Sequence, residues 1–204
     1  MPWSRQKRMD SYWRAAKQQG YRSRAAFKLI EFNEKYGLFR PGETVLDLGA
    51  APGGWSQVAI DAVDPGTVIA VDLERIERIP GVFTVRGDIF SDAAMEKVIS
   101  ACRGKVNVVV SDMAPNISGA YSTDHARSMA LAERARDVAF ALLKPKGKLV
   151  VKVFDGNMLK GLLDSLRSAF REVHVQKPRA SRKESSEIYI VCIGFAGRGP
   201  SSRR

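Results

Sequence analysis

The chain has 204 residues, 45% of them hydrophobic, which is enough to bury one substantial core and most simply forms a single domain. No apolar run approaches the roughly 18 residues of a membrane span, and the N-terminus lacks the apolar stretch of a signal peptide, so we expect a cytoplasmic protein without a membrane partner. The chain has only two cysteines, which are far apart and form no disulfide framework. Its two histidines are also far apart and give no metal-ligand pattern, so no metal is assigned.

The net charge of +11 is concentrated at the two ends of the chain. Residues 1–40 carry a net charge of +7 and residues 177–204 carry +5, whereas residues 41–176 carry −1. Aromatic residues that could stack on unpaired bases lie among the N-terminal charges: Trp3, Tyr12, Trp13 and Tyr21. This distribution predicts contact with a phosphate backbone, and hence RNA as the partner. The alternative is that both ends are only solubilising tails.

Hydrophobic periodicity predicts alternating helices and strands along the chain. Helices are expected at 4–18 and 22–36, the second ended by Gly37. Strands are expected at 44–48, 67–72, 82–86, 106–111, 148–154, 172–176 and 188–195. Further helices are expected at 54–63, 92–102, 123–143 and 157–170.

This order predicts an α/β, Rossmann-like fold with a seven-stranded, mostly parallel sheet and helices on both faces. The last two strands follow each other without a helix, so the last strand should be antiparallel. We expect one domain over residues 1–196 with a basic, helical N-terminal segment at 1–40. Residues 197–204 are expected to be a disordered basic tail.

The segment VLDLGAAPGGWSQ, residues 45–57, predicts a strand, a tight ligand-facing loop and the start of a helix. It departs from the dinucleotide fingerprint G-x-G-x-x-G, because an alanine replaces the second glycine and a proline lies inside the loop. An acid before such a loop suits a cofactor without a pyrophosphate, and S-adenosylmethionine, with cationic sulfonium and amino groups, is the leading candidate. The loop residues predicted to contact it are Asp47, Gly49, Pro52, Gly53 and Trp55. Trp55 could equally be a core residue of the helix.

Acidic residues also follow the next three predicted strands. Asp72 lies 23 residues after Gly49, where a carboxylate can bind ribose hydroxyls. Asp88 could accept a hydrogen bond from an adenine amino group, and Asp112 follows the fourth strand. Because the carboxyl ends of parallel strands meet at one edge of the sheet, these carboxylates predict a single cofactor site.

Lys152 lies in the apolar run VVKVF, where burying an unpaired ammonium group would be costly. Asp112 is its expected partner, either in a structural ion pair or in a functional cluster. Lys28 and Glu187 are two more charged residues in apolar surroundings. Together the four could form a compact lysine–carboxylate cluster.

The chain resembles the FtsJ/RrmJ (RlmE) family of RNA ribose 2′-O-methyltransferases. The motifs that carry the resemblance span nearly the whole chain: YRSRAAFKL, LDLGAAPGGWSQ, SDMAPN, VVKVF and SSEIYIV. It implies a catalytic Lys-Asp-Lys-Glu tetrad at Lys28, Asp112, Lys152 and Glu187. It also implies S-adenosylmethionine contacts at Gly53, Trp55, Asp72, Asp88 and Asp112.

The implied reaction is methylation of a uridine ribose in large-subunit ribosomal RNA by a monomeric enzyme. Lys152 would act as general base or as the group that orients the hydroxyl. Three alternatives remain open: methylation of a tRNA anticodon loop, a nicotinamide-dependent oxidoreductase, and an RNA-binding protein without catalysis.

Overall fold

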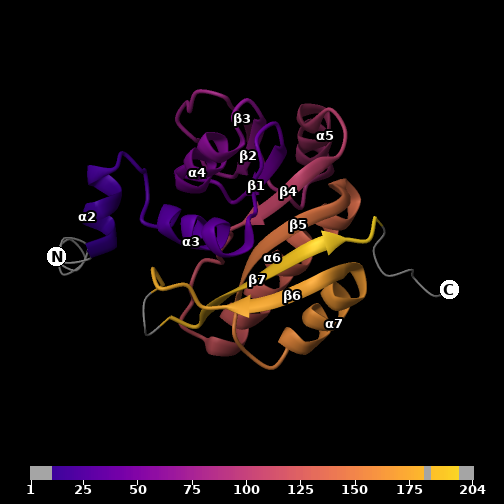
Figure 1. Cartoon of the computed structure of the whole chain (residues 1–204). Coiled ribbons are helices and arrows are strands. Elements are labelled where there is room, and N and C mark those ends of the chain that lie inside the picture. Colours follow the sequence, from indigo (N-terminus) through magenta and orange to yellow (C-terminus); the bar gives the residue numbers. More distant parts are fainter. Residues whose placement is uncertain (1–10, 182–184, 198–204) are drawn as a thin grey trace.

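The computed structural model describes residues 11–181 and 185–197 (Figure 1). The predicted helical residues 4–10 and the predicted tail at 198–204 therefore lie outside the described residues. Within the described part of the chain, no helix is both long and apolar enough to cross a membrane.

Seven strands form one sheet, as predicted, in the order β3-β2-β1-β4-β5-β7-β6. Their bounds are Thr44–Leu48 (β1), Thr67–Asp72 (β2), Val82–Arg86 (β3), Val106–Ser111 (β4), Leu143–Phe154 (β5), Phe170–Gln176 (β6) and Glu187–Phe195 (β7). Neighbours from β3 to β5 pair in parallel, and β7 runs antiparallel between β5 and β6. The prediction of a reversed last strand is confirmed.

Six helices are described: α2 (Ser11–Gln18), α3 (Ala26–Tyr36), α4 (Gly54–Val63), α5 (Asp92–Cys102), α6 (Tyr121–Leu142) and α7 (Leu159–Ala169). The predicted helix over 22–36 was wrong at its start. Successive backbone bonds from residues 26, 27 and 28 reach back only three residues, so the chain enters α3 through tight turns. Strand β5 begins five residues earlier than predicted, because Leu143 pairs with Val106 before a register shift in the ladder.

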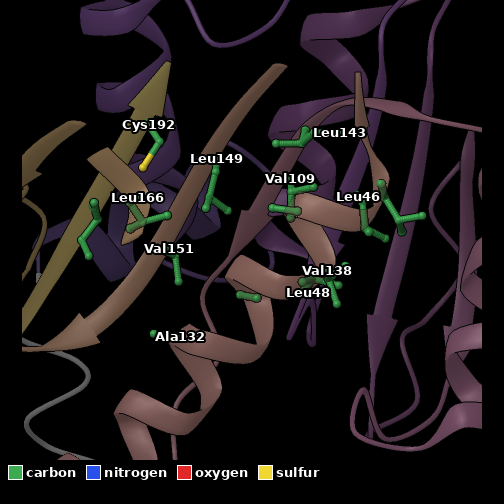
Figure 2. Packing of buried hydrophobic residues seen from close by; sticks show 14 of the residues in the cluster. Leu46, Leu48, Val109, Ala132, Val138, Leu143, Leu149, Val151, Leu166 and Cys192 are labelled. Atoms are coloured by element: carbon green, nitrogen blue, oxygen red, sulfur yellow. The ribbon is translucent and has the colours of Figure 1, made fainter. Parts of the chain in front are cut away.

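The alternation of side chains along the strands divides the core between the two faces of the sheet. Helices α5, α6 and α7 pack on one face against residues such as Leu46, Val109 and Leu149 (Figure 2). Helices α3 and α4 cover the other face through a second cluster that includes Phe32 and Tyr189. The prediction of helices on both faces is confirmed.

The strand ends of β1, β2, β3 and β4 are aligned at one edge of the sheet, because Leu48 pairs with both Val71 and Ser111 and Asp72 pairs with Arg86. The loops that leave this edge approach one another closely. Gly49 has a φ of +74°, and a Cβ atom there would lie 2.5 Å from Cγ of Met113. Glycine is therefore required at this position both for its conformation and for its space.

Candidate active site

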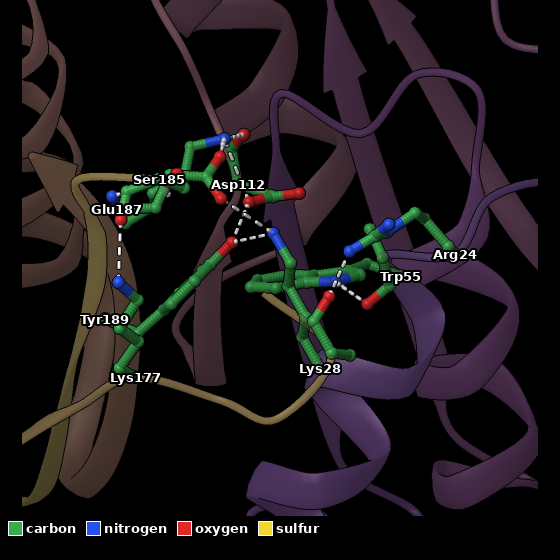
Figure 3. A network of polar contacts seen from close by, with 11 residues as sticks. Arg24, Lys28, Trp55, Asp112, Lys177, Ser185, Glu187 and Tyr189 are labelled. Carbon is green, nitrogen blue, oxygen red and sulfur yellow. Dashed lines mark hydrogen bonds and ion pairs between the residues drawn. The ribbon is translucent and has the colours of Figure 1, made fainter. Parts of the chain in front are cut away.

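The four predicted cluster residues come together from four separate elements, and Figure 3 labels three of them, Lys28, Asp112 and Glu187. Lys28 lies on α3, Asp112 follows β4, Lys152 lies within β5, and Glu187 begins β7. Nζ of Lys152 lies 3.0 Å from Oδ1 of Asp112 and 3.9 Å from Oε1 of Glu187, and Nζ of Lys28 lies 3.3 Å from Oε2 of Glu187. We call these four residues the tetrad. Both lysine side chains are almost wholly buried, so each has its charged partner within the site.

Tyr189 connects the tetrad, and its part there was not predicted. Its hydroxyl donates to Oδ1 of Asp112 at 2.6 Å and accepts a hydrogen bond from Nζ of Lys28 at 2.7 Å. Burial, together with the negative charges of Asp112 and Glu187, raises the pKa of the Tyr189 phenol well above its usual value. The hydroxyl therefore remains a donor to Asp112 at neutral pH.

The electrostatics of Asp112 follow from these contacts. Burial alone would raise the pKa of this carboxyl, but the ammonium groups of Lys152 and Lys28 and the Tyr189 hydroxyl together lower it below its ordinary value. Asp112 is therefore a carboxylate at neutral pH. Its backbone oxygen also accepts a hydrogen bond of 2.5 Å from Nζ of Lys152, so one residue fixes the direction of that amine through two acceptors.

A cavity of about 630 Å³ opens at the aligned strand ends, and we call it the first cavity. Four residues predicted to bind the cofactor line it: Gly49, Asp72, Asp88 and Asp112. They come from the ends of β1, β2, β3 and β4 in turn. The volume is that of a pocket for a small organic ligand, and carboxylates on its wall suit a ligand with hydroxyl groups and a positive charge.

The other predicted cofactor residues, Asp47, Pro52, Gly53 and Trp55, are not among the residues that line the first cavity. Strand β1 runs one residue past Asp47, which turns its side chain toward α4, where it accepts a 2.6 Å hydrogen bond from Ser56. The predicted bounds of this strand, 44–48, are confirmed, and the contact of Asp47 with a cofactor stays a prediction.

Pro52, Gly53 and Trp55 lie close to the chain that precedes α3. The Trp55 indole nitrogen donates to the backbone oxygen of Ala25 at 2.7 Å, and its ring is buried in the core. Arg22 donates to the backbone oxygen of Pro52 at 3.1 Å and to Glu77 and Arg78 oxygens, which braces the loop. In this structure these three residues shape the loop, and their contact with a cofactor stays a prediction.

Complete burial raises the pKa of Asp47 to about 7, and this gives a testable pH dependence. In the unfolded chain the pKa of an aspartate is about 3.9. Between these two values the folded protein retains a proton that the unfolded chain has released, so this group's contribution to the free energy of unfolding falls as the pH rises and levels off above about 7. The full effect is about 4 kcal/mol, because each pKa unit corresponds to about 1.4 kcal/mol.

Asp47→Asn should therefore gain stability relative to the original protein as the pH rises from 4 to 7. The difference between the two free energies of unfolding, measured by urea denaturation at each pH, isolates Asp47 from other titrating groups such as Asp112. A difference that does not change with pH would contradict the assignment.

A second cavity, of about 500 Å³, adjoins the first. Ala114 lines both cavities, Asp112 lines the first and Glu187 lines the second. Because Lys152 lies within 4 Å of both carboxylates, the tetrad stands between the two cavities. Such an arrangement can hold two ligands with their reacting atoms facing each other across the tetrad.

Segment 177–187 joins β6 to β7 beside this site, and its described residues are fastened to the body of the protein. Arg24 donates to the backbone oxygen of Ala180, and Lys177 donates to that of Ser185 at 2.8 Å (Figure 3). The first contact joins the segment to the chain that precedes α3 and the second joins the two ends of the segment, while the backbone nitrogen of Arg179 donates to Glu31 of α3 at 2.9 Å.

Comparison with known proteins gives close matches over most of the chain. A family model described as FtsJ-like methyltransferase matches residues 21–195. A protein named ribosomal RNA large subunit methyltransferase E from Natronomonas pharaonis is 53% identical over 92% of this chain and 74% of its own length. The protein of that name from Methanothermobacter thermautotrophicus is 44% identical, covering 96% of this chain and 94% of its own.

Solved structures agree with the fold. A crystal structure from Plasmodium falciparum, named as a ribosomal RNA methyltransferase, superposes with a TM-score of 0.78 at 30% identity, covering 87% of this chain and all of that one. A Streptococcus mutans protein solved in complex with SAH superposes with a TM-score of 0.54 at 10% identity, covering 84% of this chain and 96% of that one, which supports the fold alone.

Proposed function

The chain belongs to the FtsJ-like methyltransferase family, and from this premise we propose that it transfers a methyl group from S-adenosylmethionine to a ribose 2′-hydroxyl of large-subunit ribosomal RNA, at a uridine. The observation that carries the proposal is the position of the tetrad between two adjoining cavities. One cavity can hold the methyl donor and the other the acceptor. A protein that only binds RNA has no need of buried lysines at such a place, and the alanine and Pro52 in the glycine loop, with the basic ends of the chain, count against a nicotinamide-dependent oxidoreductase.

The first cavity fits S-adenosylmethionine by the chemistry of its walls. Carboxylates of Asp72 and Asp88 suit the ribose hydroxyls and the adenine amino group, and the carboxylate of Asp112 would suit the positive charge of the sulfonium group. The loop that carries Asp72 is held firmly, since its carboxylate accepts hydrogen bonds of 2.9 Å from the backbone nitrogens of Ala51 and Glu74. When bound, S-adenosylmethionine supplies the activated methyl group, and the protein has to supply position and proton removal.

The tetrad performs the positioning. Asp112 and Glu187 hold Nζ of Lys152 on the boundary between the cavities, where it contacts the 2′-oxygen of the acceptor and aligns it for in-line attack. Lys28 neutralises Glu187 and, through Tyr189, fixes Asp112. The bond from the 2′-oxygen to the methyl carbon would form as the carbon–sulfur bond breaks, the sulfur would leave as a neutral thioether, and the hydroxyl proton would pass to Lys152, if its amine is neutral, or to solvent water.

The choice of ribosomal RNA rests on the names of the relatives and on the basic ends of the chain. Contacts to phosphates carry no base information, so they support RNA as a class rather than one sequence. All four tetrad residues come from one chain, so the reaction needs no second subunit. We propose a monomer with one domain over residues 1–196 that acts in the cytoplasm.

The test is transfer of labelled methyl from S-adenosylmethionine to separate pools of large ribosomal subunits, free ribosomal RNA and tRNA. The proposal predicts label in the large subunit or its RNA. If only tRNA were labelled, the proposed reaction would stand, but the proposed RNA substrate would be wrong. Absence of S-adenosylmethionine binding by calorimetry, with binding of NAD instead, would overturn the proposal.

A further inference from the structure

The second cavity is lined by apolar side chains and by several polar groups, among them Asp124 and His125. The apolar residues are Ala114, Pro115, Ile117, Tyr121 and Phe154. Glu187 of the tetrad, beside Ser185 and Ser186, lines the same cavity. A cavity whose lining combines apolar side chains with a few polar groups is the usual form of a site that holds the flat part of a ligand and directs its polar part.

Tyr121 is exposed and yet firmly held. Its side chain is 62% exposed, and that of Ile117, which lines the same cavity, is 66% exposed. The Tyr121 hydroxyl donates to the backbone oxygen of Asp155 at 3.2 Å, and its ring stacks on the buried ring of His125, with 9° between the planes and 5.9 Å between the centroids. Two large apolar side chains exposed at one cavity of a strongly charged protein indicate a surface that a ligand covers.

Hydrogen bonds of Asp124 and His125, both on α6, also fix the chain around Tyr121. The carboxylate of Asp124, one turn into α6, accepts hydrogen bonds from the backbone nitrogens of Ser118 and Gly119 at 2.8 Å and 3.0 Å. His125 in turn accepts a hydrogen bond of 3.4 Å at Nε2 from the backbone nitrogen of Met158. The ring of Tyr121 is therefore a preorganised aromatic surface, which loses little conformational entropy when a ligand stacks on it.

We propose that the second cavity takes the target nucleoside of the RNA, turned out of its neighbours' stack, with the base on the ring of Tyr121. The inference rests on the proposed function and identifies its acceptor site. A base on Tyr121 places the attached ribose between the aromatic wall and Glu187, which is the side from which the 2′-oxygen can reach Lys152. Stacking suits this role because every base has a π-face, and a base must leave its stack before an enclosed site can act on its nucleoside.

The test compares Tyr121→Ala, Tyr121→Phe and Phe83→Ala in methyl transfer to large-subunit RNA. Tyr121→Ala should lower kcat/KM for RNA by about 10- to 100-fold, the usual loss on removing a stacking aromatic residue. Tyr121→Phe keeps the ring and should remain within about threefold of the original protein. Phe83, an aromatic residue with similar exposure on β3, lines neither cavity, so Phe83→Ala should leave kcat/KM unchanged.

S-adenosylmethionine affinity and thermal unfolding are measured on the same three variants and should not change. Methyl transfer by Tyr121→Ala at the original rate would overturn the inference and leave the proposed function intact. A loss of kcat/KM in Tyr121→Phe as large as that in Tyr121→Ala would have the same meaning. Absence of transfer by the original protein to every RNA pool would instead overturn the proposed function, and this inference with it.

Discussion

Replacing Lys152 by alanine should lower the rate of methyl transfer by at least roughly 100- to 1,000-fold, the size of effect expected when a preorganised group at the reacting atoms is removed. Its amine lies within 4 Å of both Asp112, which lines the first cavity, and Glu187, which lines the second. Because Lys152 does not line the first cavity, S-adenosylmethionine affinity should stay within about threefold. Single-turnover methyl transfer and calorimetry measure the two quantities separately.

Lys148 offers a matched control for this substitution. It lies four residues earlier on the same strand and is buried to a similar degree, but its Nζ donates to the backbone oxygens of Gly37 and Leu38, away from both cavities. Lys148→Ala should lower stability while folded molecules retain their rate of transfer. Equal loss of rate in both variants would show that the effect of Lys152→Ala is structural and would contradict its catalytic role.

Replacing Asp72 by alanine should weaken S-adenosylmethionine binding by roughly 10- to 100-fold, which corresponds to the loss of hydrogen bonds to a charged group. Its carboxylate both lines the first cavity and orders the backbone at Ala51 and Glu74, so the substitution removes a ligand contact and loosens the loop. The affinity is measured by calorimetry in the absence of RNA.

Asp61→Ala is the control for the change in charge, because this exposed aspartate lies on α4 and lines neither cavity. It should bind S-adenosylmethionine as the original protein does. If Asp72→Ala bound the cofactor with unchanged affinity, the first cavity would not be the cofactor site.

Most of the site could be predicted from the sequence because it follows from topology. Acids that end neighbouring parallel strands must meet at one edge, which is why Asp72, Asp88 and Asp112 line one cavity. A lysine in a buried strand needs a partner, which identified Lys152 and Asp112. Their apolar surroundings pointed to Lys28 and Glu187, and the family resemblance then implied that both belong with Lys152 and Asp112, which sequence spacing alone could not have decided.

What could not be predicted depended on single positions. Asp47 lies inside β1, and its hydrogen bond with Ser56 on α4 depends on three-dimensional packing that the strand pattern does not show. Tyr189 was hidden because tyrosine is common in buried strands; its place two residues after Glu187, on the same face, was the available signal. Tyr121 could not be assigned, because loop 113–120 before it has no periodicity and its stacking on His125 depends on three-dimensional contact.

The central claim is that the tetrad directs methyl transfer to a ribose oxygen, and the most direct test identifies the methylated atom. Large-subunit RNA methylated by the purified protein would be digested to nucleosides and analysed by mass spectrometry, beside RNA treated with Lys152→Ala. We expect 2′-O-methyluridine from the original protein and none above background from the variant. A methyl group on a base, or 2′-O-methyluridine formed equally well by both proteins, would contradict it.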